Sequence, residues 1–374
     1  MRKFKILLRF FWVLSSFTGV GQNAQTDSLK AVLQTSKEDT AKVEILLLLS
    51  RSLYITQPDE SVQFADEAII LSEKLNYKKG LAYALKNIGM AHYLQGKYLE
   101  TINYWQQSLN TFKEIGDKVG VANLLNNLGA VNNNEGDDTR ALELYLESLK
   151  VSEEIGDSLR IVTALINIGL VYSKKPNTHD TALEYYKRAI PLSEKIGDND
   201  AIGTASLNIG EIYLERGDYT TALSYFEKSL KALEPSGNIF YSLNNIGKVY
   251  AKRGDFNSAI KFQTEAYEKA KKVDAKLDMS RSLLGLADTY IQQKNYRAAL
   301  NSFNEAKSIA MEIGSNYELR DSYEGLARSF AEVADFKNAF KYQSLLTDIK
   351  DTLFNTANEK KLLLIQLNYD INKK

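Results

Sequence analysis

The chain has 374 residues, and its 47 Lys and Arg are balanced by 47 Asp and Glu. Hydrophobic residues make up 44% and charged residues 25%, which is the composition of a globular protein. No cluster of Lys and Arg marks a nucleic-acid surface. The chain has no cysteine, which excludes a thiol nucleophile, a thiolate zinc site and a lipid anchor on an N-terminal cysteine.

The start of the chain has the pattern of a secretory signal peptide. Arg2, Lys3, Lys5 and Arg9 precede an apolar stretch at 10–20, and small residues follow at cleavage spacing. Eleven apolar residues are too few to span a bilayer, which needs about twenty, so an uncleaved anchor is the weaker alternative. Removal of this segment would leave 43 basic and 47 acidic residues, so the remaining chain would have a net charge near minus four. We therefore expect an exported protein in the periplasm of a bacterium.

A glycine or alanine, here called the marker, recurs about every forty residues after this segment. A fixed period of this size predicts stacked supersecondary units that bury their apolar faces against one another. The markers are Gly89, Gly129, Gly169, Gly210, Gly247, Ala287 and Ala327.

Each repeat has the spacing of two helices. Between Leu125 and Leu149, apolar residues recur at intervals of three and four, and Gly136 interrupts them with a residue suited to a left-handed turn. The marker lies inside the first helix, where glycine costs about 1 kcal/mol relative to alanine. We expect the small residue twelve positions later to face it, with aromatic residues filling the space beyond. Aspartates at the starts of first helices are predicted N-caps, namely Asp117, Asp157 and Asp198.

The order of apolar residue, glycine, tyrosine, then alanine, aromatic and small residue resembles the tetratricopeptide repeat, in a variety of about forty residues. The resemblance implies an all-α fold, a right-handed α-α superhelix (TPR solenoid) of about eight helix pairs with a C-terminal capping helix. The predicted organisation is a signal peptide at 1–21, an N-terminal segment at 22–40, repeats at 41–75, 82–115, 122–155, 162–196, 203–235, 240–273, 280–313 and 320–353, and a C-terminal helix at 354–374.

Two irregularities interrupt the period. One extra residue falls in the loop 174–180, and Pro235 shortens the second helix of the fifth repeat because proline lacks the amide donor. The junction at Pro235 is either a bend or hinge, or a tolerated loop variation.

The resemblance implies that the first helix of each pair lines a concave surface. In the third repeat, Asn123, Asn126, Asn133 and Asn134 fall on the predicted inner face. Asparagine is a poor helix former, and its amide matches the backbone of an extended peptide. Alternatively, these residues solvate the groove or bond neighbouring helices. The asparagine two positions before the marker recurs in five repeats, which favours a structural hydrogen bond. The candidate peptide-binding residues are Lys86, Asn87, Asn123, Asn126, Asn127, Asn133, Asn134, Asn244 and Lys248.

The sequence offers little for catalysis. His92 and His179 have no recognisable relay partner, and no phosphate-binding glycine loop occurs. We expect no enzyme activity, no cofactor and no metal site.

The predicted function is an interaction scaffold that binds a protein or peptide, with no nucleic-acid partner and no lipid anchor. The alternative is a detached sensor domain of a bacterial signal-transduction protein whose output domain follows elsewhere. The C-terminal helix either caps the last repeat or leads into such an output.

Overall fold

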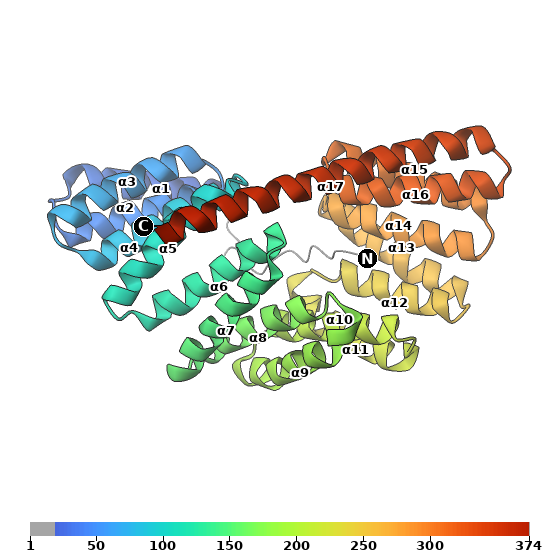
Figure 1. The fold of residues 1–374 in the computed structure, drawn as a ribbon, viewed down its shortest axis with the longest axis horizontal. Coiled ribbons are helices and arrows are strands. Elements are labelled where there is room, and N and C mark those ends of the chain that lie inside the picture. Colours follow the sequence, from blue (N-terminus) through green and yellow to red (C-terminus); the bar gives the residue numbers. More distant parts are fainter. Residues whose placement is uncertain (1–18, 374) are drawn as a thin grey trace. The chain divides into compact units, whose positions relative to one another are not determined.

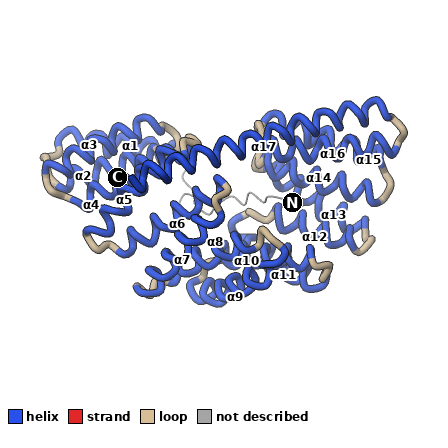
Figure 2. Tube along the Cα trace, in the orientation of Figure 1, coloured by secondary structure: helices blue, strands red, loops and turns tan. Residues whose placement is uncertain are grey.

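The computed structural model describes residues 19–373, so the predicted signal peptide lies almost wholly outside it. The described residues form seventeen α-helices and two short 3-10 helices joined by tight turns, and this part of the chain contains no strand (Figure 1, Figure 2). The all-α prediction is confirmed. No helix within these residues is long and apolar enough to cross a membrane.

The helices divide into two compact units. The first contains residues up to Lys174 together with Lys360–Lys374, and the second contains Lys175–Glu359. The helices that begin in the first unit are α1 (Gly19–Thr35), α2 (Thr40–Leu53), α3 (Pro58–Lys74), α4 (Lys78–Leu94), α5 (Tyr98–Glu114), α6 (Lys118–Glu135), α7 (Asp138–Glu154) and α8 (Ser158–Tyr172).

The second unit begins with a short 3-10 helix, η1, and contains a second one, η2, between α11 and α12. Its helices are η1 (Pro176–Thr178), α9 (His179–Ile196), α10 (Asn199–Glu215), α11 (Tyr219–Leu233), η2 (Glu234–Ser236), α12 (Phe240–Lys252), α13 (Phe256–Lys272), α14 (Lys276–Gln292), α15 (Tyr296–Glu312), α16 (Asn316–Glu332) and α17 (Phe336–Lys373).

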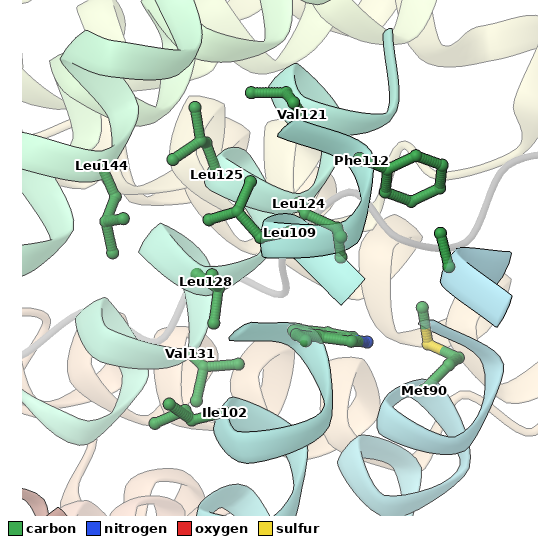
Figure 3. Packing of buried hydrophobic residues seen from close by; sticks show 12 residues of the cluster. Met90, Ile102, Leu109, Phe112, Val121, Leu124, Leu125, Leu128, Val131 and Leu144 are labelled. Carbon is green, nitrogen blue, oxygen red and sulfur yellow. The ribbon is translucent and has the colours of Figure 1, made fainter. Parts of the chain in front are cut away.

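In the first unit, successive helices pack through apolar clusters. The largest described cluster joins α4 to α7 and contains the buried Trp105. Phe112 and Leu128 of the same cluster are also buried (Figure 3). Leu125, which begins the helical pattern in the sequence, is also buried there. Each repeat therefore buries its apolar face against the next, as stacked repeats require.

The second unit is built in the same way from smaller clusters. Phe226 of α11 packs with Ile246 and Val249 of α12, so each second helix contacts the first helix of the following pair. Stacked rings recur between the two helices of a pair, as in Tyr250 on Phe262, whose centroids lie 5.5 Å apart at an angle of 3°.

The turns and caps follow the sequence prediction. Gly136 ends α6 with φ 89°, a left-handed conformation that favours glycine. The predicted N-caps are confirmed at Asp117, Asp157 and Asp198, whose carboxylates accept from backbone N–H groups three residues later.

The environment of the marker glycines corrects one prediction. At three markers the closest residue is an aromatic ring sixteen positions later rather than the alanine twelve positions later, whereas at Gly247 it is Gln263, with the Ala259 carbonyl also close. A helical glycine therefore leaves room for a ring of the second helix, and that contact offsets its poor helix propensity. An added Cβ would lie 2.2 Å from Trp105 at Gly89, 2.7 Å from Tyr145 at Gly129 and 2.6 Å from Phe226 at Gly210.

The two irregular loops both contain a 3-10 helix with a proline, at the first residue of η1 (Pro176) and the second residue of η2 (Pro235). α11 ends at Leu233 before η2, so the predicted end of this helix at Pro235 is confirmed. Whether this junction bends stays a prediction. His179 is the first residue of α9 and is buried, whereas the sequence placed it in the loop.

The two ends of the described chain are more helical than the sequence suggested. The N-terminal segment forms α1, for which no structure was predicted. α17 runs without a break through the second helix of the eighth repeat and the segment predicted as a separate C-terminal helix.

Candidate peptide-binding surface

Polar side chains connect the first helices of neighbouring repeats. The recurrent asparagine two positions before the marker is buried in all five repeats, at Asn87, Asn127, Asn167, Asn208 and Asn245. In the second repeat its amide donates to the Leu47 carbonyl on α2 over 3.1 Å. Asn87 is thus buried and bonded to another helix, and Asn127 is buried, so neither belongs to an exposed binding surface.

The asparagines on α6 that lie on the predicted inner face are partly exposed, and three of them accept hydrogen bonds from α8 or the residues just after it. In each case the carbonyl half of the amide is the acceptor. The donors are Arg160 Nε to Asn123 (2.9 Å), Asn167 Nδ2 to Asn126 (2.9 Å) and Lys174 Nζ to Asn133.

These bonds use the oxygen of each amide and leave its NH2 group available for another acceptor. The Nδ2 groups of Asn123, Asn126 and Asn133 have no hydrogen-bond partner among the described residues. Because each Oδ1 is held by a cation or an amide donor, the donor half is oriented away from that contact. The three residues lie within about 80° of one another around the helix and span about 15 Å along it. They form what we call the amide row.

Asn134 lies next to the amide row, but here the NH2 group is bonded and the oxygen is available. Its Nδ2 donates to the Tyr93 hydroxyl of α4 over 3.3 Å, which leaves its carbonyl half facing away from that bond. Asn132, for which the sequence suggested no partner, is buried and donates to the Leu128 carbonyl one turn earlier.

Lys86 lies on α4, one repeat before the amide row. Its ammonium lies 5.8 Å from the centre of the Tyr83 ring, and no carboxylate of the described residues forms an ion pair with it. Burial lowers the pKa of Lys86 to about 8, with Arg51 and Arg160 as cationic neighbours that add to the effect. An anionic group of a ligand next to Lys86 would therefore stabilise its charged form.

The candidates in the second unit lie in a different setting. Lys248 donates to Asn245 over 3.0 Å, and the Tyr241 hydroxyl donates to Glu211 over 2.7 Å. Burial raises the pKa of Glu211 to about 7. Asn244 is buried and donates to the Arg281 carbonyl on α14, so it joins helices and is not exposed to a ligand.

The comparisons with known proteins match this architecture. Tetratricopeptide repeats match residues 80–154, 120–195, 161–235, 201–272 and 238–312, which together cover more than half of the chain. The chain belongs to the tetratricopeptide repeat family.

Solved structures of this fold align along most of the chain. The apo form of the quorum sensor NprR from B. thuringiensis has a TM-score of 0.67 at 19% identity and covers 88% of this chain and 93% of its own. A Rap protein complexed with competence and sporulation factor has a TM-score of 0.63 at 16% identity, covering 89% and 93%. Aspartyl phosphate phosphatase F from Bacillus subtilis has a TM-score of 0.62 at 14% identity, and the alignment covers 90% of this chain and 96% of its own. No curated relative matches the sequence.

The partners of the asparagines were not anticipated from the sequence. In this tetratricopeptide repeat protein, Tyr93, Arg160 and Lys174 lie 37 to 41 positions from the asparagines that they bond. The repeat period could have identified these partners, because residues one period apart lie side by side on consecutive first helices.

The two histidines lie in separate settings. His92 stacks on Tyr104 at 5.5 Å, and the buried His179 has its Nε2 3.7 Å from a Glu215 carboxylate oxygen. No group of three histidine or acidic residues with the geometry of a metal site occurs among the described residues.

Proposed function

We propose that this tetratricopeptide repeat protein is an exported, non-catalytic scaffold that binds an extended segment of another protein, or a peptide, along its first helices. The amide row on α6 is the observation on which this rests. Three aligned N–H donors without an internal partner suit the carbonyl groups of an extended backbone, whatever its side chains.

The dimensions of the amide row fit such a ligand. Its length of about 15 Å corresponds to four or five residues of an extended strand, at about 3.3 Å per residue. Asn134 adds an acceptor at one end for a backbone N–H group. Lys86, without an ion-pair partner in the described residues, adds an attraction for an acidic group of the ligand.

The similar solved structures support a peptide or protein as the ligand class. One of them is a Rap protein in complex with competence and sporulation factor, and another is a quorum sensor. At identities below 20% these likenesses concern the fold. The choice of ligand for this chain therefore rests on its own residues.

Export is supported by the basic and apolar pattern at the start of the sequence. Intact-mass measurement of the protein recovered from the periplasm tests it. Cleavage near residue 21 is the expected result, and an uncleaved chain retained in the cytoplasm would contradict export.

The binding proposal is tested with a library of random decapeptides captured on the immobilised full chain. The informative variant combines Asn123→Asp, Asn126→Asp and Asn133→Asp. Aspartate keeps the oxygen that accepts from Arg160, Asn167 and Lys174, so these contacts survive while the three N–H donors are lost. We expect this variant to remain folded and to lose peptide enrichment.

A matched control replaces three exposed asparagines of second helices, Asn103, Asn110 and Asn301, by aspartate. This variant adds the same charge and should enrich the same peptides as the unmodified chain. Equal enrichment by both variants would reject the amide row as the binding surface. Absence of any enrichment by the unmodified chain would reject peptide binding itself.

A sensory role is the second candidate, because the chain aligns along 93% of the quorum sensor NprR. In that case the bound peptide is a signal rather than a segment of a stable partner. Genes for a membrane span and an output domain next to the coding sequence would support this role, and a constitutive complex with one structural protein would oppose it.

A further inference from the structure

The last helix exposes a stripe of phenylalanines. Phe336, Phe340 and Phe354 of α17 are 69%, 77% and 66% exposed, among the largest values for big apolar side chains in the described residues. They lie within about 40° of one another around the helix and span about 27 Å along it. We call them the phenylalanine stripe.

In the preceding repeat, the equivalent positions are covered by the next first helix. Tyr296 of α15 corresponds to Phe336, and its hydroxyl donates to Glu332 of α16 over 2.9 Å. Leu300 corresponds to Phe340 and packs in the cluster that contains Leu326 of α16. Phe336 and Phe340 thus lie on the surface on which this fold stacks another helix, while Phe354 extends the stripe beyond it, because the equivalent Gly314 lies in a turn.

The described chain does not supply that helix. α17 continues as one helix to Lys373, so the C-terminal segment does not fold back over the stripe. The other side of α17 already packs on α16, where the Tyr342 ring stacks on Phe330 at 5.6 Å and Leu346 is buried. α17 therefore has two apolar faces, one packed and one exposed.

Exposed charges next to the stripe are self-complementary. Lys337 and Lys341 lie in the first half of this stretch, and Asp348 and Asp351 lie in the second half. All four project to the same side of the stripe, within about 60° to 140° of Phe336 around the helix.

The pairs of complementary residues have midpoints within one residue of one another along the helix. The midpoint of Phe336 and Phe354 is residue 345, that of Lys337 and Asp351 is residue 344, and that of Lys341 and Asp348 falls between these two residues. A two-fold axis at that point, perpendicular to the helix, places each lysine near an aspartate of the other copy. It also keeps both charged edges on the same side of the contact.

We propose that α17 pairs antiparallel with α17 of a second copy of this chain, through the phenylalanine stripe and its charged edge. Burial of six phenylalanines in the pair provides the attraction, and the charges set its direction and register. The contact is isologous, so it closes at a dimer. It leaves α6 and its amide row out of the contact residues.

Sedimentation equilibrium of the purified full chain tests the dimer. The expected mass is twice the 42.1 kDa of one chain. Phe336→Ser with Phe340→Ser should raise the dissociation constant by about tenfold or more, without a change in helical circular dichroism. The matched control is Ile70→Ser with Val273→Ser, at positions 67% and 66% exposed outside α17, and it should remain a dimer.

A charge exchange tests the antiparallel register. Lys341→Asp alone should weaken the dimer, because it brings acidic groups together in both halves of the contact. Adding Asp348→Lys to the same chain should restore the dimer, since the exchanged charges again face each other. A monomeric unmodified chain, a dimer that survives loss of both phenylalanines, or a charge exchange without rescue would each overturn the proposal.

Discussion

An asparagine amide carries donors and an acceptor on one planar group, and α6 uses the two halves for different purposes. The acceptors of Asn123, Asn126 and Asn133 receive hydrogen bonds from the neighbouring repeat. That contact fixes the orientation of the amide before any ligand arrives. A pre-oriented donor loses less conformational entropy on binding than a freely rotating one. The structural and ligand-binding roles of these residues are therefore compatible.

The buried carboxyl of Glu211 predicts a pH-dependent stability. Burial raises its pKa from 4.5 to about 7, despite the Tyr241 hydroxyl and nearby Lys248, which favour the charged form. The folded state thus holds a proton that the unfolded state has lost. Stability should fall as pH rises from 4.5 to about 7, by up to about 3 kcal/mol.

Urea unfolding at about pH 5 and about pH 8 measures this effect. Glu211→Gln should abolish most of the loss, because a neutral amide can still accept from Tyr241. The exposed Glu227→Gln is the control and should behave like the unmodified chain. Equal pH dependence in the Glu211 variant would contradict the assignment.

The contact between a marker glycine and a ring predicts the effect of adding one methyl group. At Gly129 a new Cβ would lie 2.7 Å from the buried Tyr145 ring. Overpacking of this kind costs about 1–3 kcal/mol, against a helix-propensity gain of about 1 kcal/mol. Gly129→Ala should therefore lower the free energy of unfolding, and less so in a Tyr145→Leu background. A stabilised Gly129→Ala protein would show that the ring moves aside freely.

At the residue scale the sequence placed the amide row but not its contacts. The helical spacing put Asn123, Asn126 and Asn133 on one face, and that face is partly exposed in the structure. Their bonding partners lie on another helix, so they depend on how consecutive repeats are aligned. Spacing within one helix does not contain that information, which explains why buried Asn127 and Asn244 were grouped with the exposed residues.

At the scale of single helices, the boundaries depend on short local signals. Asp117 caps α6 by accepting from the Gly120 N–H over 2.8 Å, and it thereby sets where the helix with the amide row begins. Asp117→Ala should cost about 1 kcal/mol of unfolding free energy, while Asp117→Asn should be nearly neutral because asparagine also caps. Thermal unfolding followed by circular dichroism measures both. Equal losses in the two variants would indicate that the charge, not the cap, matters.

Helix boundaries were predictable where glycine or aspartate marks them. Gly136 has φ 89° and Asp137 caps the next helix, so this pair ends α6 and starts α7. α17 shows the opposite case, because no glycine or proline occurs between Phe336 and Lys373. The sequence divided it at 353 only because the repeat period ends there. The structure continues the helix because nothing in its sequence stops it.

For the whole molecule, the forty-residue period was enough to predict the fold. Each period encodes a helix pair whose apolar face is buried by the next pair, so an all-α repeat protein follows from local pattern alone. The exposed phenylalanine stripe of α17 follows from the same principle, because no helix pair among the described residues packs on it. What the period does not encode is the ligand. That depends on the side chains displayed on the first helices.

The most direct test of peptide binding is a crystal structure of the full chain with a decapeptide selected from the random library. We predict an extended peptide whose carbonyl oxygens lie within hydrogen-bond distance of Nδ2 of Asn123, Asn126 and Asn133. The contacts of these amides with Arg160, Asn167 and Lys174 should remain. A peptide bound as a helix, or bound on the second helices with the amide row unoccupied, would contradict the account.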